Sequence, residues 1–145
     1  MPKPFHLMVL TPEREFYSGE AVYVSVQSIA GSLGVLADHV PMVSALDVGA
    51  LIIQPDEHTT RTAFHSEGFI EVRPECVYIL SQACEWPEEI DEKRALEAEQ
   101  RAQERLAQER GDDLGTMGHS KVALMRAMTR QKIKSMRSWL PPRSS

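Results

Sequence analysis

The segment EEIDEKRAL, residues 88 to 96, carries an acid and a base at a spacing that could start a helix or hold a ligand. Asp91 and Arg94 are three residues apart, so on a helix they would share a face. An aspartate at a helix N-terminus complements the helix dipole, and an acid–base pair at this spacing adds about 0.2–0.5 kcal/mol. The same groups could form half of a binding site, and the segment alone leaves both interpretations open.

The other groups that could support catalysis or bind metal are not grouped in the sequence. The chain contains no Gly-x-x-x-x-Gly-Lys-[Ser/Thr] phosphate-binding loop. Cys76 and Cys84 lack zinc-type spacing, and we expect both to be reduced strand residues. A small enzyme built around Asp38, His39 and His65 is an alternative, but no nucleophile, base and orienting group stand together. We therefore expect neither catalytic residues nor a metal site.

Charge is distributed unevenly along the chain. Its 145 residues have a formal net charge of -5 at pH 7, which gives no general reason to expect nucleic-acid binding. No acidic residue follows Asp113, whereas the basic residues there are Lys121, Arg126, Arg130, Lys132, Lys134, Arg137 and Arg143. A mildly acidic chain that ends in a basic segment predicts an acidic partner for that segment.

The first half of the chain has the two-residue period of β-strands. In AVYVSVQSI, residues 21 to 29, three valines on one face alternate with Tyr23, Ser25 and Gln27. Other short apolar segments between Phe5 and Ala83 are separated by turns that contain Gly, Pro and Asp. Many short strands at close spacing predict an antiparallel β-sandwich or barrel of about 80 residues.

The second half, from Glu88, has the composition of helices. Ala, Glu, Gln, Arg and Leu dominate residues 88 to 110, and no Gly or Pro interrupts them. The glycine-rich GDDLGTMGHS should stop and turn the chain, and we expect a second helix to begin at His119 or Ser120 and end before Pro141. The sequence thus predicts an antiparallel two-helix hairpin after the β-domain.

The predicted division is a β-domain over residues 1–86, a helical hairpin over 87–140 and a disordered tail over 141–145. Alanines let the two helices approach closely but bury little apolar area, so the hairpin should be held weakly. Such a hairpin could leave the β-domain and rearrange, and an ordinary helical appendage is the alternative.

The N-terminus MPKPFHLMVL lacks the apolar run of a signal peptide, and no window approaches about 18 apolar residues. We expect a soluble chain that is not exported and that reaches a membrane only through a partner.

Four blocks of sequence follow one another in a recognisable order: FHLMVLTPEREFYSGEAVYVSV, GSLGVLADHVPMVSALDVGAL, GFIEVRPECVYIL and IDEKRA. With this order and spacing the chain resembles the epsilon subunit of bacterial F-type ATP synthase over residues 5 to about 137. The most specific part is Gly31-x-Leu33-Gly34-Val35-Leu36-x-x-His39-x-Pro41, followed by Gly68-Phe69-x-Glu71-Val72. The resemblance implies a ten-stranded β-sandwich followed by a two-helix domain.

The resemblance also implies a function, that of a non-catalytic rotor subunit in the central stalk. The β-domain of such a subunit binds the gamma subunit and the polar loops of the membrane c-ring. The helices fold against the β-domain or extend along gamma into the alpha/beta catalytic head, where they inhibit ATP hydrolysis. The implied location is peripheral, on the cytoplasmic face of the bacterial inner membrane. No cofactor is required, and ATP is implied as a regulatory ligand.

The family's ATP-binding pattern can be placed on this sequence residue by residue. The positions that match it are Glu85, Ile90, Asp91, Arg94, Ala95 and Arg101, with Arg126 and Arg130 on the second helix. Arg126 and Arg130 are four residues apart, so their guanidinium groups would share one face and could meet a triphosphate. Without a phosphate-binding loop, such a site would bind nucleotide and not hydrolyse it.

Two further contact sets are implied by the same resemblance. Ser32 and His39 match the surface that faces the c-ring, although an acidic residue is common at the position of Ser32. On the second helix the contacts with an acidic segment of the catalytic beta subunit would be Lys121, Arg126, Arg130, Lys132, Lys134 and Arg137. Because Arg126 and Arg130 belong to both sets, phosphate and the beta subunit would compete for them.

An alternative from another class is a free-standing β-sandwich module whose basic helix docks nucleic acid or another acidic partner. Its basic helix lacks interleaved aromatic residues, and we expect no nucleic-acid binding.

Overall fold

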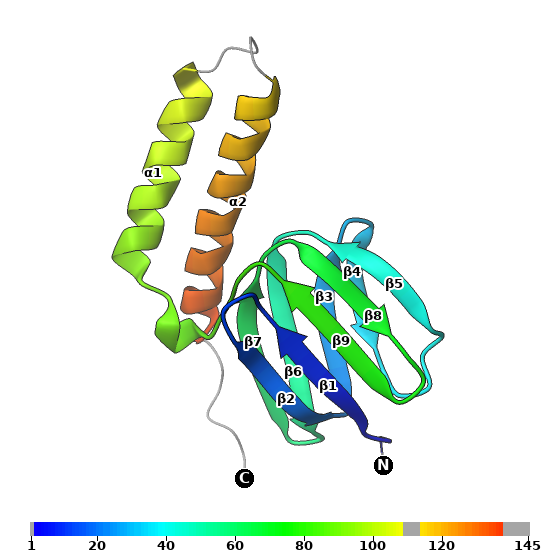
Figure 1. Cartoon of the computed structure of the whole chain (residues 1–145). Coiled ribbons are helices and arrows are strands. Elements are labelled where there is room, and N and C mark those ends of the chain that lie inside the picture. Colours follow the sequence, from blue (N-terminus) through cyan, green and yellow to red (C-terminus); the bar gives the residue numbers. More distant parts are fainter. Residues whose placement is uncertain (1, 109–113, 138–145) are drawn as a thin grey trace.

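The computed structural model describes residues 2–108 and 114–137, with side chains over 2–108 and 120–135. It contains a β-domain followed by a helical hairpin (Figure 1). The strands are β1 Phe5–Leu10, β2 Glu15–Ala21, β3 Tyr23–Ser28, β4 Gly31–Val35, β5 Met42–Leu46, β6 Gly49–Asp56, β7 Thr59–His65, β8 Gly68–Val72, β9 Cys76–Ser81 and β10 Cys84–Glu85. The predicted class, about ten strands followed by two helices, is confirmed.

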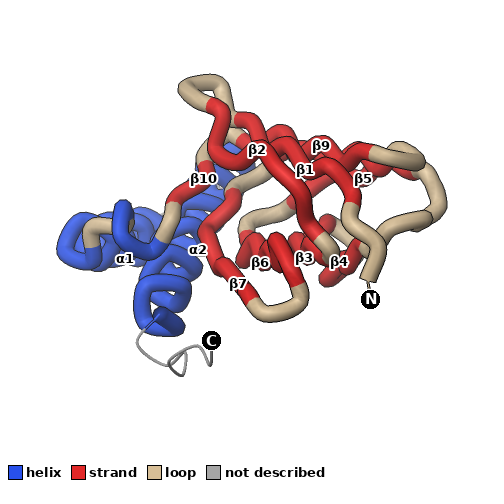
Figure 2. The backbone as a smooth tube through the Cα atoms, turned by 90° about the horizontal axis from the view of Figure 1, so that it is seen from below, coloured by secondary structure: helices blue, strands red, loops and turns tan. Residues whose placement is uncertain are grey.

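The strands form one continuous sheet that folds over into two layers. The order is β10-β7-β6-β3-β5-β8-β9-β1-β2, and β4 pairs with the free side of β3. A single residue pair between β3 and β5, Ser28 with Leu46, joins the layers. The view of Figure 2 shows β6, β3 and β4 on one side and β1, β2 and β9 on the other. All strand pairs in the described residues are antiparallel except β1 with β9, which is parallel and departs from the all-antiparallel prediction.

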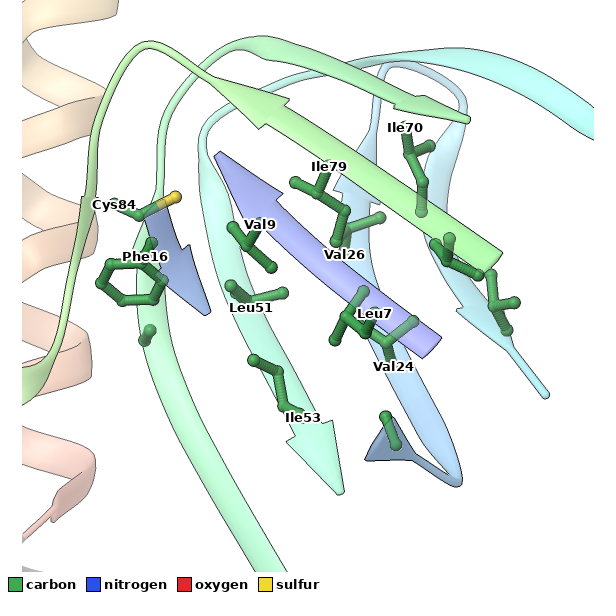
Figure 3. Close-up of a cluster of buried hydrophobic side chains, with 14 of the residues drawn as sticks. Leu7, Val9, Phe16, Val24, Val26, Leu51, Ile53, Ile70, Ile79 and Cys84 are labelled. Carbon is green, nitrogen blue, oxygen red and sulfur yellow. The ribbon is translucent and has the colours of Figure 1, made fainter. Parts of the chain in front are cut away.

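The core lies between the two layers and follows the predicted alternation. In β3, Val24 and Val26 are buried while Tyr23, Ser25 and Gln27 are half-exposed. Figure 3 shows these valines facing Leu7 and Val9 of β1 and Ile79 of β9 across the interior. Both cysteines are free thiols on strands, as predicted.

The helices begin at different residues from those predicted. A short 3-10 helix, η1 Pro87–Glu89, precedes α1 Glu92–Gln108, so the first α-helix starts four residues after Glu88. The second helix, α2 Leu114–Arg137, starts before His119 and includes Gly115 and Gly118. The prediction treated these glycines as breaks. A glycine lowers helix stability by about 1 kcal/mol, which need not end a helix that packs against another. The predicted tail over 141–145 lies outside the described residues.

The hairpin is attached to the β-domain mainly through α2. Helix α1 packs along α2, with Ala95, Ala102 and Ala127 buried where they meet. Helix α2 in turn lies against β6, β7 and η1. The apolar part of this contact is a small cluster of Val48, Phe64, Ile90 and Ile133, separate from the main core. The weakly held hairpin that the alanines predict is consistent with this small cluster.

Adjacent residues on β9 provide a test of the two-layer arrangement. Ile79 is completely buried in the main core, whereas Leu80 points outward and is 47% exposed. We expect Ile79→Ala to lower the free energy of unfolding by about 2–5 kcal/mol, because it leaves a cavity between the layers. Leu80→Ala, the matched control, should change it by less than about 1 kcal/mol. Urea denaturation of the isolated chain measures both, and equal losses would contradict the assigned faces of β9.

Candidate functional site

A cavity of about 330 Å³ opens where the two helices meet the end of the β-domain. Its walls come from β10, η1, α1 and α2, and the lining residues are Glu85, Glu89, Asp91, Arg94, Ala95, Ala98, Arg101 and Arg130. Six of these eight positions were predicted to bind ATP. Glu89 and Ala98 line the cavity but were not predicted to do so, whereas Ile90 and Arg126 were predicted for the site and do not line the cavity.

Asp91 starts α1 and also lines the cavity. One of its carboxylate oxygens accepts a hydrogen bond from the Arg94 backbone N–H at 3.1 Å, and its carbonyl oxygen accepts one from the Ala95 N–H at 2.9 Å. This is the geometry of an N-cap residue, which satisfies a helix donor that would otherwise lack a partner. The two interpretations of the segment are therefore compatible, because the capping residue also lines the cavity, and the binding role of Asp91 stays a prediction.

The segment over residues 86–91, between β10 and α1, is called the hinge below. Ile90 anchors this hinge and is absent from the cavity wall. It is only 4% exposed and packs in the small cluster with Phe64 and Ile133. Its side chain therefore points toward the interface between α2 and the β-domain. The apolar residue of the sequence pattern acts here as a packing contact that places Asp91.

Arg130 closes one side of the cavity through an ion pair. Its Nε donates to both carboxylate oxygens of Glu85, at 2.8 and 2.9 Å. The guanidinium carbon also lies 4.5 Å from the centre of the Phe64 ring, a cation–π contact. Both side chains of the pair are about three-quarters buried, so water screens this pair less than an exposed one.

Arg94 and Arg101 supply the positive charge that remains available. Within the described residues, neither guanidinium donates a hydrogen bond or joins an ion pair. The two residues are seven positions apart on α1, which separates them by about 10.5 Å along the helix axis. The small side chains of Ala95 and Ala98 lie between them on the cavity wall. This arrangement suits an elongated anion with several charges, such as a polyphosphate.

Glu89 is held in place by a residue far away in the sequence. One of its carboxylate oxygens accepts hydrogen bonds from Arg14 Nη2 at 2.8 Å and from the Trp86 backbone N–H at 2.9 Å. Arg14 Nη2 also donates to the Cys84 carbonyl oxygen at 3.2 Å. The hydrogen bond from Arg14 lowers the pKa of Glu89 below its ordinary value. No sequence signal linked Arg14 to this segment, because 75 residues separate it from Glu89.

Trp86 fixes the start of the hinge against the β-domain. Its ring stacks on Phe16 with centroids 4.3 Å apart, and the Arg61 guanidinium lies 3.8 Å from the tryptophan ring centre. Arg14 lies 5.1 Å from the Phe16 ring. Glu85 and Glu89, on either side of Trp86, therefore form a wall of the cavity that belongs to the β-domain. The α1 and α2 residues form the opposite wall.

The remaining basic residues of α2 have separate positions. Arg126 pairs with Glu67 of the β7–β8 corner, and Lys134 donates to the Pro87 carbonyl oxygen at 2.7 Å. Lys132 lines a different cavity of about 410 Å³ between α2 and the face of β3 and β6. Lys121 is exposed, and the side chain of Arg137 lies outside the described residues.

Ser32 and His39 are not brought together. Ser32 is exposed at the start of β4 and donates to the Gln27 side-chain oxygen at 3.3 Å. His39 lies in the loop after β4, where its Nδ1 is 2.8 Å from the Val40 carbonyl oxygen. The two residues are seven positions apart, with most of β4 between them, and no hydrogen bond joins their side chains in the described part of the chain. Their assignment to one contact surface with the c-ring remains a prediction.

The described residues offer neither a membrane span nor a metal centre of the usual kinds. None of the helices described combines the length and the apolar composition that a membrane-spanning segment needs. The same residues contain no cluster of three or more His, Cys, Asp or Glu side chains that could hold a metal ion.

Comparison with known families assigns nearly the whole chain. Residues 4–87 match the model of the β-sandwich domain of the ATP synthase delta/epsilon chain, and residues 88–134 match that of its long α-helix domain. The chain belongs to the ATP synthase delta/epsilon chain family. The resemblance found in the sequence is thereby confirmed, and members of this family are non-catalytic subunits of ATP synthase.

Individual relatives support the same assignment. The chain is 44% identical over 136 residues to the ATP synthase epsilon chain of Caldanaerobacter subterraneus, covering 93% of this chain and 96% of the relative. It is 49% identical over 126 residues to the epsilon chain of Ruminiclostridium cellulolyticum, covering 87% and 92%. A chain of the Euglena gracilis mitochondrial ATP synthase structure OSCP/F1/c-ring shares the fold, with a TM-score of 0.75 at 19% identity and coverage of 97% and 84%.

The hydrogen bond between Arg14 and Glu89 makes the hinge sensitive to acid. Because the pKa of Glu89 is lowered in the folded chain, its contribution to stability is present above the pKa of the unfolded state. That contribution is lost as pH falls through the lower, folded-state pKa. We expect Arg14→Gln to return the Glu89 pKa toward its ordinary value, which carboxyl-detected NMR titration measures. An unchanged pKa would contradict the assigned role of Arg14.

Proposed function

We propose that this chain is the regulatory epsilon-type subunit of an ATP synthase rotor and that its cavity binds ATP without hydrolysing it. The observation that carries the nucleotide part is the pair of guanidinium groups of Arg94 and Arg101 on one wall of the cavity, which have no ion-pair partner among the described residues. The family membership carries the subunit part. ATP acts as a regulatory ligand, and the subunit needs no cofactor.

The charge balance of the cavity supports an anionic ligand. Of its three carboxylates, Glu85 is paired with Arg130, Glu89 is paired with Arg14, and Asp91 caps α1. The carboxylates are thus already engaged in contacts with the protein, whereas the guanidinium groups of Arg94 and Arg101 have no such partner among the residues that the structure describes. A volume of about 330 Å³ falls within the usual range of about 300–1,000 Å³ for small-molecule sites.

Ligand binding at this site would favour the closed hairpin. One wall belongs to the β-domain, and the other belongs to α1 and α2. If the hairpin leaves the β-domain, the walls separate and the site no longer exists as one unit. ATP would bind the closed state more tightly than the open one, and its differential affinity sets how far it shifts the population. In the open state the helices would extend into the alpha/beta catalytic head and inhibit ATP hydrolysis.

The outer face of the layer that contains β5, β8, β9 and β1 is the surface that we propose for the gamma subunit. Val43 on β5, Phe69 on β8 and Leu80 on β9 are 67%, 56% and 47% exposed. Phe69 is the direct cross-strand neighbour of both Ala45 and Leu80, and Leu80 is that of Leu10, so this row continues across four strands. A row of exposed apolar side chains on a rigid sheet is typical of a protein–protein contact.

The other contacts follow from the same assignment. The c-ring would contact the loops around Ser32 and His39, and the beta subunit would contact the basic residues of α2 in the open state. The subunit would then lie peripherally at the cytoplasmic face of a bacterial inner membrane and reach the membrane only through its partners.

ATP titration of the isolated chain tests the nucleotide site. We expect the wild-type chain to bind ATP, and Arg94→Gln and Arg101→Gln each to weaken binding by about tenfold, because each removes a charged hydrogen bond to phosphate. Arg105→Gln, one turn beyond Arg101 on α1 and outside the cavity wall, is the matched control. Isothermal calorimetry measures the affinities, and phosphate release should stay at background. Equal affinity of all four chains would contradict the site.

Binding to an isolated gamma subunit tests the apolar row. We expect Phe69→Asp to weaken the complex by at least about tenfold, because it places a charge at the centre of an apolar contact. Leu96→Asp changes a similarly exposed leucine on α1 and serves as the control. Surface plasmon resonance gives the affinities, and circular dichroism checks that both variants fold. Wild-type affinity of a folded Phe69→Asp chain would place the gamma contact elsewhere.

A further inference from the structure

Three basic side chains of α2 form one stripe that faces the β-domain. Arg126, Arg130 and Lys134 are spaced four residues apart, so they lie along the same side of the helix. Each meets its own acceptor: Glu67 at the β7–β8 corner, Glu85 on β10 and the carbonyl oxygen of Pro87 in η1. Helix α2 runs beside the β-domain next to β7 (Figure 1). Together they fix the position of α2 along that edge.

The contact between Arg126 and Glu67 is a two-point fork. Arg126 Nε donates to one carboxylate oxygen at 3.1 Å, and Nη2 donates to the other at 2.5 Å. Two parallel bonds fix the orientation of both planar groups, which a single contact does not. Glu67 and Arg126 are 59 positions apart, so the fork joins the β-domain directly to the middle of the hairpin.

The corner that carries Glu67 is rigid. The Glu67 carbonyl oxygen accepts a hydrogen bond from the Gln82 N–H at 3.0 Å, and Ser66 exchanges bonds with Ser81 and Ala83. A Cβ atom at Gly68 would lie 1.8 Å from the Leu80 carbonyl oxygen, which shows how closely the neighbouring strand approaches. The Glu67 carboxylate is therefore presented from a fixed position, and ordering it at the contact costs little conformational freedom.

The fork engages Arg126, a residue that the sequence pattern assigned to the phosphate of a bound nucleotide. Arg126 faces Glu67 and does not line the cavity, although it lies one turn from Arg130, which does. Burial alone would raise the pKa of Glu67, but the hydrogen bond from Arg126 brings it below its ordinary value. The carboxylate is therefore charged at neutral pH and available as an acceptor.

We propose that Glu67 is a built-in anion that holds the hairpin closed on the β-domain when no ligand is bound. The Glu67 carboxylate accepts the hydrogen bonds of the Arg126 guanidinium that a phosphate or an acidic side chain of a partner would otherwise accept. Opening the hairpin requires this fork to break, so any acidic partner of Arg126 must compete with Glu67. The proposal goes beyond the nucleotide site and does not depend on it, because the fork forms without ligand.

Hydrogen exchange of the full-length, ligand-free chain tests whether the Glu67–Arg126 fork acts as a latch that holds the hairpin closed. Once α2 is undocked, the two-helix segment is only marginally stable, so backbone exchange over residues 121–135 reports opening. We expect Glu67→Gln to speed that exchange by about three- to tenfold, a modest factor because the pair is about one-third exposed. Glu71→Gln is the matched control, since Glu71 pairs with Arg73 on the same layer and not with the hairpin.

Two further measurements separate the latch from general damage. Exchange over β8 and β9 should be the same in Glu67→Gln and wild type, because the corner is held by backbone and serine contacts that remain. The double variant Glu67→Arg with Arg126→Glu should exchange more slowly over 121–135 than Arg126→Glu alone, because the pair is restored in reverse. Exchange in Glu67→Gln equal to that in Glu71→Gln, or no recovery in the double variant, would overturn the proposal.

Discussion

The docking of α2 on the edge of the β-domain is the contact on which the rest of this structure depends. Ile133 enters the small cluster with Val48, Phe64 and Ile90, and polar contacts from Arg126, Arg130 and Lys134 lie alongside it. Helix α1 reaches the β-domain largely through α2 and the hinge. The candidate cavity, which needs walls from both parts, therefore exists only while α2 is docked.

The two parts of the chain differ greatly in how firmly they are held. The β-domain buries a large core between its layers, whereas the hairpin joins it through four apolar residues and a few partly exposed ion pairs. Apolar area stabilises by about 25 cal/mol per Å², and exposed ion pairs add about 0–1 kcal/mol each. Opening the hairpin is therefore a far smaller change than unfolding the β-domain. Regulation by hairpin opening needs this difference in stability. A ligand or partner can shift the balance between the closed and open hairpin by no more than the difference in its binding free energy for the two states.

The sequence predicted the parts of the molecule that depend on local pattern. Alternating valines predicted β3 and the alanine-rich composition predicted α1, although α1 begins after its cap Asp91 and not at Glu88. The missed residues are those whose role arises from tertiary contact. Glu67, Glu89 and Arg14 have ordinary sequence surroundings, and only the fold brings them to their partners. The position of Arg126 outside the cavity was hidden for the same reason: helical spacing shows which residues share a face but not what that face contacts.

The division of charge between the helices gives them different roles. The α2 residues Arg126 and Arg130 are paired with Glu67 and Glu85. The α1 residues Arg94 and Arg101 have no ion-pair partner among the described residues. An anion that enters the cavity can therefore contact α1 without breaking any existing pair. The stack of Trp86 on Phe16 keeps Glu85 and Glu89 with the β-domain, so motion is best absorbed after η1, near Ile90. Opening there would carry Arg94 and Arg101 away and leave the two carboxylates behind. The closed state is therefore the one in which the arginines of α1 face the paired carboxylates, and it is the state that the proposed ligand and the proposed Glu67–Arg126 contact would both stabilise.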